Sequence, residues 1–283
     1  MYPQKGLEIG SEAADLSELH KPRGPDLFRP AHSLTVEIPS LVAGDKRVAL
    51  LRAFAAPVLY ILVLKLAGRA DTYSAGSTAA FFVLCGAIVL AGTAVALFAR
   101  ITGLRVKVRA EQYEGAGWVF IFCVGCVSAA FIGLSTGVQI PTATIFRIIL
   151  LSALIGIAEE LTFRGVCLSS LHQVTGSVVA LFASSAIFAL AHFSNLWAGQ
   201  TLATTRVQVI SAMLGGLFFG WTYLKLDGGL WVVAIAHAMF DGTIFILAIT
   251  QPSLFFVMFA IFPVGLAAML WFWLRVAIRR ARL

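Results

Sequence analysis

Charge is scarce in this sequence of 283 residues. Only 12% of the residues are Asp, Glu, Lys or Arg, whereas 59% are hydrophobic. A soluble domain normally carries roughly twice that charged fraction, so the composition excludes an ordinary soluble fold. The formal net charge is +7, but the basic residues lie in short stretches between apolar runs, as they do in loops at an anionic membrane surface. This placement argues against a nucleic-acid partner and for a lipid bilayer.

Cysteine is also rare, and it gives no disulfide framework. The four cysteines all lie in apolar stretches. Cys123 and Cys126 have the CxxC spacing of redox and metal sites, but such sites need a polar setting and usually a second pair. The setting here is Phe-Cys-Val-Gly-Cys-Val. We therefore interpret these two cysteines as small apolar packing residues.

Long apolar runs are what the sequence has in abundance. Eight of them are long enough to cross a bilayer core of about 30 Å, and they cover residues 48–67, 78–98, 116–138, 143–170, 177–197, 205–224, 229–249 and 253–274. In lipid each backbone must satisfy its own hydrogen bonds, so these runs should be helices. The predicted fold class is an all-α, polytopic membrane protein, a bundle of about eight transmembrane helices.

The domain organisation follows from the same pattern. Residues 1–46 are rich in charge and proline and are predicted to be a flexible cytoplasmic tail. Residues 47–275 form the transmembrane core, and 276–283 a basic cytoplasmic C-terminus. Ala212, Gly216 and Gly220 form a ridge of small residues on the sixth run, which predicts close packing against another helix.

Lysine and arginine predict the orientation. With the N-terminus inside, the cytoplasmic stretches hold Lys46, Arg47, Arg52, Arg100, Arg105, Lys107, Arg109, Lys225, Arg275, Arg279, Arg280 and Arg282. The opposite side holds only Lys65, Arg69, Arg147 and Arg206. Because cytoplasmic loops carry the excess of basic residues, both termini are predicted to be cytoplasmic. The Ala-, Gly- and Arg-rich composition favours a bacterial inner membrane.

Acidic residues nearly disappear in the second half of the chain. After Glu114 the sequence has only Glu159, Glu160, Asp227 and Asp241. Asp227 lies in a Gly-rich turn, but the other three lie inside apolar runs, as do His192 and His237. An ionisable group at bilayer depth costs at least about 2.5–3.5 kcal/mol, so it is a functional candidate by default. The depths of these residues in their runs roughly agree, which predicts one polar site near the middle of the membrane.

The local spacing separates the two adjacent glutamates. Glu160 and Arg164 are four residues apart and share a helix face, so they can form an ion pair. Glu159 is rotated from Glu160 by about 100° on the helix. It is therefore left available as a general base in an apolar cavity.

The two intramembrane histidines have helical partners of their own. His192 follows Phe188 by four residues, and His237 precedes Asp241 by four. With Glu159 they could activate a water and stabilise an oxyanion, or they could bind a metal such as zinc. The potential metal ligands are Glu159, His192, His237 and Asp241, although the absence of an HExxH motif excludes a zincin-type helix. Purely structural alternatives are an ion cluster at Glu160, a bond from His192 to a carbonyl, and a bond between His237 and Asp241.

These residues resemble the three motifs of a known family. Glu159-Glu160-xxx-Arg164, Phe188-xxx-His192 and His237-xxx-Asp241 are similar, in order, to the EExxxR, FxxxH and HxxxN/D motifs of the CAAX protease and bacteriocin-processing (Abi-type) family. The resemblance covers residues 140–250 by motif. It implies a membrane-embedded endopeptidase with an eight-helix core. The best-studied branch removes the last three residues of prenylated CAAX proteins, whereas others process peptides or act in bacteriocin immunity.

The resemblance also implies a role for each residue. Glu159 would be the base that activates water, with His192 beside it, and Glu160 and Arg164 would support the site. His237 and Asp241 would line the oxyanion side, and Phe188 would pack the second motif. Many members carry Asn where this chain has Asp241. An ionised Asp cannot donate to an oxyanion, so Asp241 must be protonated, orient His237 or bind a metal.

The sequence thus predicts an intramembrane endopeptidase that acts on a membrane-associated protein or peptide, including a lipidated one. The cavity is expected to open laterally or toward the cytoplasm, because both peptide and water must enter. Metal-dependent and glutamate-only chemistry both stay open, as does the substrate. Two alternatives are a catalytically silent immunity or binding protein and a proton-coupled transporter, because intramembrane acids and histidines also build proton relays.

Overall fold

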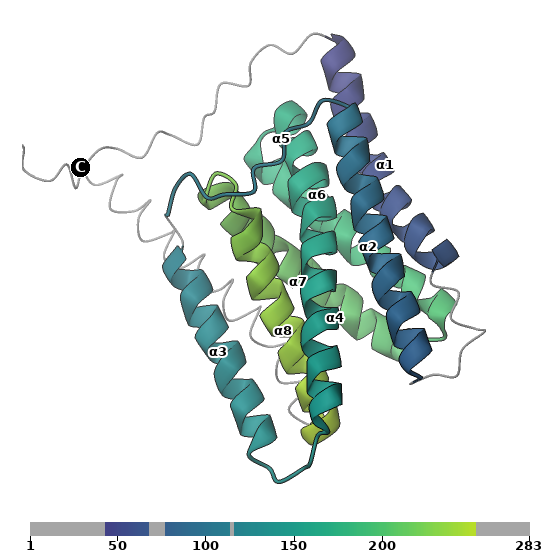
Figure 1. Cartoon of the computed structure of the whole chain (residues 1–283). Coiled ribbons are helices and arrows are strands. Elements are labelled where there is room, and N and C mark those ends of the chain that lie inside the picture. Colours follow the sequence, from purple (N-terminus) through teal and green to yellow (C-terminus); the bar gives the residue numbers. More distant parts are fainter. Residues whose placement is uncertain (1–42, 68–76, 114–115, 253–283) are drawn as a thin grey trace, which may run out of the picture. The chain divides into compact units, whose positions relative to one another are not determined.

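The computed structural model describes residues 43–67, 77–113 and 116–252, and these residues contain helices and no strand (Figure 1). Seven helical spans among them are long and apolar enough to cross a membrane: Asp45–Leu66, Thr78–Ile101, Ala116–Leu134, Thr142–Thr175, Ser177–Ala198, Leu202–Lys225 and Leu230–Thr250. They confirm the first seven predicted runs and the all-α membrane fold. The eighth predicted run, 253–274, lies outside the described residues, as do most of the predicted tail and the basic C-terminus.

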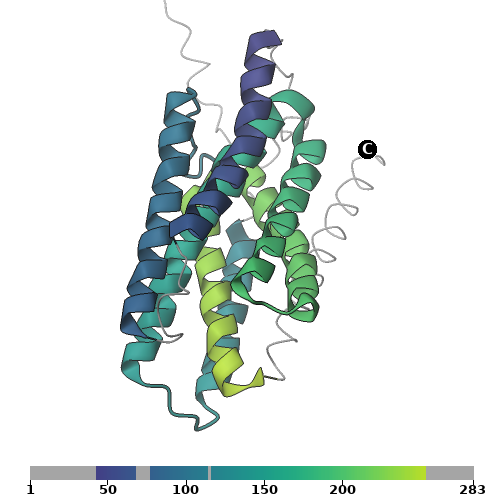
Figure 2. The same cartoon turned by 90° about the vertical axis from the view of Figure 1, so that its right-hand side faces the viewer.

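The helices pack mainly in antiparallel pairs (Figures 1 and 2). α1 (Ala43–Ala67) lies against α2 (Thr78–Ile101), and α6 (Ser177–Ala191) lies against α7 (Leu202–Lys225). α8 (Leu230–Thr250) packs on one side against α3 (Ala116–Leu134) and on the other against α4 (Thr142–Glu160). The pairing of α4 with α8 matters most for function, because these helices carry the first and third motifs.

The small-residue ridge on α7 provides the close approach that the sequence predicted. A Cβ added to Gly216 would lie 2.9 Å from the Cβ of Ser185 on α6, and one added to Gly220 would lie 2.7 Å from the Cδ1 of Leu181. Because lipid gives helices no hydrophobic reason to associate, such small residues allow the van der Waals contact that holds them together.

The fourth span is a single helical segment with a π-helical interruption. α4 continues at Glu160 into a π-helix, η3 (Leu161–Leu168), and then into α5 (Ser169–Thr175). The π-helix begins directly after the paired glutamates and contains Arg164. π-Helical turns are rare and are frequently found at functional sites. Hydropathy predicted the span but not this change of helix type.

The fifth span also changes its helix type at a motif residue. α6 ends at Ala191, and His192 begins a 3₁₀ helix, η4 (His192–Ala198). Gly199 closes this helix with φ of 81°, a left-handed conformation that glycine adopts without strain. α7 then begins at its N-cap Thr201, whose hydroxyl accepts a hydrogen bond from the backbone N–H of Thr204.

An extended segment, residues 104–112, crosses the end of the α7–α8 turn, and we call it the strap. The carbonyl of Leu226 accepts bonds from the backbone N–H groups of Glu111 and Gln112, at 3.0 and 3.1 Å, and Gly229 donates to the carbonyl of Arg109 at 3.0 Å. Lys107 reaches Asp227 at 2.8 Å. This hydrogen bond raises the pKa of the Lys107 ammonium above its usual value. The strap therefore fixes the turn that leads into the third motif.

Substitution of Gly216 by Ala is expected to lower the thermal unfolding midpoint of the protein in detergent. The added methyl would collide with α6, and overpacking of this kind typically costs about 1–3 kcal/mol.

The matched control is Gly86→Ala, because Gly86 lies on α2 and a Cβ there meets nothing within 4 Å. This control should leave the midpoint unchanged or raise it, since Ala favours a helix over Gly by about 1 kcal/mol. Equal midpoints for the two variants would contradict the tight α6–α7 contact.

Candidate active site

A cavity of about 690 Å³ lies among the helices that carry the three motifs. Its lining includes all four predicted catalytic residues, Glu159, His192, His237 and Asp241. They come from three different spans, and the structure brings them together as their similar depths in the sequence predicted. The volume falls within the range of about 300–1,000 Å³ typical of ligand sites.

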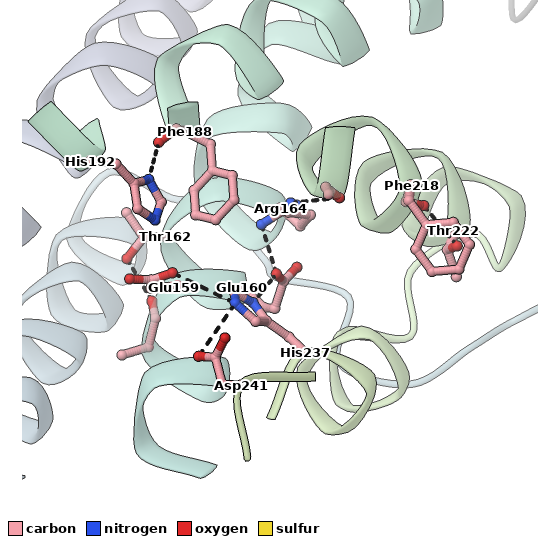
Figure 3. A network of polar contacts seen from close by, with 12 residues as sticks. Glu159, Glu160, Thr162, Arg164, Phe188, His192, Phe218, Thr222, His237 and Asp241 are labelled. Atoms are coloured by element: carbon pink, nitrogen blue, oxygen red, sulfur yellow. Dashed lines mark hydrogen bonds and ion pairs between the residues drawn. The ribbon is translucent and has the colours of Figure 1, made fainter. Parts of the chain in front are cut away.

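Glu160 is the buried centre of a polar network next to the residues that line this cavity (Figure 3). Its side chain has 0% exposure, and one oxygen, Oε1, accepts from Arg164 Nη1 at 2.7 Å and from His237 Nδ1 at 2.7 Å. The predicted ion pair with Arg164 is thus confirmed. The bond to His237 joins the first motif to the third across 77 positions of sequence.

His237 presents its other nitrogen to two carboxylates. Because Nδ1 donates its hydrogen to Glu160, Nε2 is the nitrogen that faces the cavity. It lies 3.8 Å from Glu159 Oε2 and 3.7 Å from Asp241 Oδ2 (Figure 3). Both separations are too long for direct hydrogen bonds and place the three groups around one point.

His192 is oriented by the end of its own helix. Its Nδ1–H donates to the carbonyl of Phe188 at 2.9 Å, because a carbonyl oxygen can only accept. This is the carbonyl bond that the structural alternative anticipated. In the neutral ring Nε2 is then an acceptor. The bond therefore fixes the ring and leaves one lone pair available to a molecule in the cavity.

Aromatic rings hold Arg164 in place. Its guanidinium carbon lies 4.5 Å from the ring centre of Phe188 and 5.6 Å from that of Phe219. Phe188 also packs edge-on against His192, with ring centres 4.9 Å apart, and Phe219 stacks on His237 at 5.2 Å. Phe188, the first residue of the second motif, thus contacts both the supporting cation and a site histidine.

The sequence analysis did not single out several residues of the cavity. Tyr60 on α1 lines it and lies near enough to Glu159 and Asp241 to interact with both electrostatically. A polar wall is formed by Ser194, Asn195, Gln200, Thr204 and Gln208, and the side chains of Asn195 and Gln208 share a hydrogen bond of 3.0 Å. The amides of Asn195 and Gln208 lie inside apolar runs, and the cost of burying them could have marked them as candidate site residues. Tyr60 could not be recognised in this way, because tyrosine is common in apolar runs.

The described side chains do not form a recognised metal site. Within the described parts of the chain, no group of three or more His, Cys, Asp or Glu side chains has the geometry to hold a metal ion. Nδ1 of His237 and of His192 each bonds to a protein acceptor, which orients the two rings and leaves Nε2 of each facing the cavity.

Comparison with known proteins agrees with the geometry. The family model described as type II CAAX prenyl endopeptidase Rce1-like matches residues 140–243, a stretch that contains all three motifs. No curated protein matches the chain. The match confirms the predicted resemblance: residues 140–243 are similar to this family of membrane endopeptidases. The seven apolar spans and this match support an integral, multi-pass membrane protein, and the match supports protease activity on a membrane-associated substrate.

The two adjacent glutamates should differ sharply in their effect on stability. Glu160→Gln is expected to lower the thermal midpoint strongly, because it leaves the charge of Arg164, which is 2% exposed, without its partner. Breaking a buried ion pair in this way costs about 3–5 kcal/mol.

The matched control is Glu159→Gln, measured by the same unfolding assay in detergent. Oε2 of Glu159 lies 3.8 Å from Nε2 of His237, beyond hydrogen-bond distance, and the Glu159 side chain is 17% exposed. Its midpoint should stay near that of the wild type. A larger loss for Glu159→Gln than for Glu160→Gln would reverse the assignment of the structural glutamate.

Proposed function

We propose that this protein is an intramembrane endopeptidase in which Glu159 activates a water molecule. The observation that carries the proposal is the convergence of Glu159, Asp241 and His237 Nε2 around one point of the cavity. An available carboxylate next to hydrogen-bonding groups, in a place with room for a peptide, is the arrangement that peptide hydrolysis needs.

The first step is attack by water on the carbonyl carbon of the scissile peptide bond. Glu159 takes a proton from the water as the new C–O bond forms. Nε2 of His192 can accept the second hydrogen of the water, because its Nδ1 is held by Phe188. Two acceptors then orient the water, and orientation of this kind supplies a large part of catalysis.

The negative charge that develops on the carbonyl oxygen needs donors. His237 donates from Nε2 in its imidazolium form, whose charge is balanced by the Glu160 carboxylate on Nδ1. Asp241 flanks the same point and donates in its protonated form. Glu159 then passes its proton to the leaving nitrogen, the C–N bond breaks, and the products are a carboxylic acid and an amine.

The lining of the cavity supports an amphipathic substrate. The polar wall on η4 and α7 can hydrogen-bond the backbone of an extended peptide. The facing wall is apolar and is formed by Ile61, Leu64, Leu84, Ile88, Ile244, Phe245 and Ala248. Such a wall suits apolar side chains or a lipid chain attached to the substrate.

The observations bear differently on the two alternatives, a proton-coupled transporter and a catalytically silent immunity or binding protein. The family match is to endopeptidases, so it gives a transporter no support. A catalytically silent member of the family would keep the same fold and the same buried ion pair. Peptidase activity that depends on Glu159 distinguishes an enzyme from such a protein.

Glu159→Gln is expected to abolish cleavage of quenched lipidated and transmembrane-type peptides by the purified protein. The amide cannot take the proton of the attacking water, and a positioned base contributes about 10²–10⁴-fold. His192→Ala should reduce the rate for the same step. Wild-type activity should persist in the presence of a chelator.

Two results would contradict the mechanism. Cleavage that persists in Glu159→Gln would show that another group activates water. Complete loss of activity with chelator, followed by recovery on addition of zinc, would show that the enzyme depends on a metal.

Asp241→Asn is expected to retain substantial activity, whereas Asp241→Ala should lose about 10²–10³-fold in kcat, the usual cost of removing one oxyanion donor. The amide keeps a donor where the protonated acid has one, and the methyl does not. The assay is the same peptide cleavage under saturating substrate. If Asn were as inactive as Ala, a donor role for Asp241 would be wrong.

A further inference from the structure

Among the described residues, the lining of the cavity reaches from the candidate catalytic residues toward one end of the helices. We call the end where α1, α6 and α8 begin the strap face, because it carries the strap, and the end where α1 and α8 finish and α2, α4 and α7 begin the opposite face (Figures 1 and 2). The cavity lining on α1 starts at Tyr60, and the lining on α8 runs from His237 to Ala248. The segments nearer the strap face, 43–59, 89–113, 164–187 and 220–236, contribute no lining residue.

The strap face is closed by a packed apolar layer. The side chains above the catalytic residues are 5% exposed or less, and they include Phe163, Val166, Cys167, Leu168, Leu171, Leu226 and Leu230. The strap is hydrogen-bonded across the α7–α8 turn on top of this layer. Neither a peptide nor a file of water molecules can pass through such packing without opening it.

The opposite face offers a polar route to the catalytic residues. Gln200 precedes α7, Thr204 lies in its first turn, and Gln208 follows one turn further along the helix. Together with Ser194 and Asn195 they form the polar wall that ends near His192. A hydrolase buried in lipid needs a supply of water, and this wall provides hydrogen-bonding groups along that path.

The two faces also differ in charge. On the strap face the described residues include Lys46, Arg47, Arg100, Arg105, Lys107, Arg109 and Lys225, whereas on the opposite face they include Lys65, Arg147 and Arg206. An excess of Lys and Arg marks the cytoplasmic side of a membrane protein. The strap face is therefore assigned to the cytoplasm.

We infer that the active site takes its substrate from the extracytoplasmic side of the membrane. The substrate class is a membrane-anchored protein or peptide whose scissile bond lies at the outer half of the bilayer, on an extended segment that leaves the lipid there. This assignment differs from a cavity open to the cytoplasm, one of the two arrangements that the sequence suggested. It deepens the proposed function, on which its substrate class rests.

The direction of access can be measured without any peptidase assay. Ser211 lies inside the cavity and is 6% exposed, so Ser211→Cys reports whether a charged, membrane-impermeant maleimide can enter. Thr204→Cys, at the exposed start of the polar wall, is a second reporter that tolerates substitution more readily. The matched control is Gln112→Cys in the strap, whose side chain is exposed on the other face.

Full-length protein in right-side-out and inverted membrane vesicles should give opposite patterns. Ser211→Cys and Thr204→Cys should be labelled in right-side-out vesicles and lose that labelling in inverted ones, while Gln112→Cys does the reverse. The wild type, with its four native cysteines, gives the background. Labelling of Ser211→Cys and Thr204→Cys from the cytoplasmic side only, or of neither from any side, would overturn the inference.

A cleavage measurement in the same vesicles separates this inference from the proposed function. A quenched transmembrane-type peptide with a charged tag that prevents it from crossing should be cut in right-side-out vesicles of wild type and not of Glu159→Gln. If the cysteines label from outside but no peptide is cut, the direction of access stands and the proposed function loses its support. If the peptide is cut only in inverted vesicles, the enzyme stands and the direction of access is wrong.

Discussion

The structure depends on one constraint: a charged carboxylate buried at bilayer depth needs a cation or hydrogen-bond donors in direct contact with it. Glu160 has no exposed surface and meets this demand with a single oxygen that accepts from both Arg164 and His237. An uncompensated charge at that depth would cost several kcal/mol. The pairing therefore joins the fourth and the last described spans and also orients His237 in the cavity, so the same atoms stabilise the bundle and position a candidate catalytic side chain.

Hydropathy predicted the spans well because crossing lipid leaves a chain little choice. Seven runs were predicted to within a few residues at most ends. The cost of burying ionisable groups predicted that Glu159, His192, His237 and Asp241 lie together, and all four line the cavity. The bond between Glu160 and His237 could not be predicted from the sequence, because no local spacing connects residues 77 positions apart. The π-helix at Leu161–Leu168 was equally hidden, since a helix of either type satisfies its own backbone in lipid.

The end toward which the cavity extends could not be predicted either. It depends on which side chains pack above the catalytic layer, and on a strap from a segment that hydropathy treats as an ordinary basic loop. The same loop carries Arg105, Lys107 and Arg109, much of the positive charge on that face. A single short segment thus closes one end of the site and supplies the basic residues of that end.

The surroundings of Arg164 explain why the first motif has arginine, and not lysine, at this position. Nη1 binds Glu160, Nη2 points to the carbonyl of Gly215 at 3.4 Å, and Phe188 and Phe219 lie against the guanidinium. Only a flat, delocalised cation can use its edge for hydrogen bonds and its face for aromatic contact at once. A lysine would supply the same charge as a point, strongly hydrated and without a plane. The arginine of the EExxxR motif is therefore required for its planar shape as well as for its charge. Phe188 of the second motif contacts that plane and so belongs to the same arrangement.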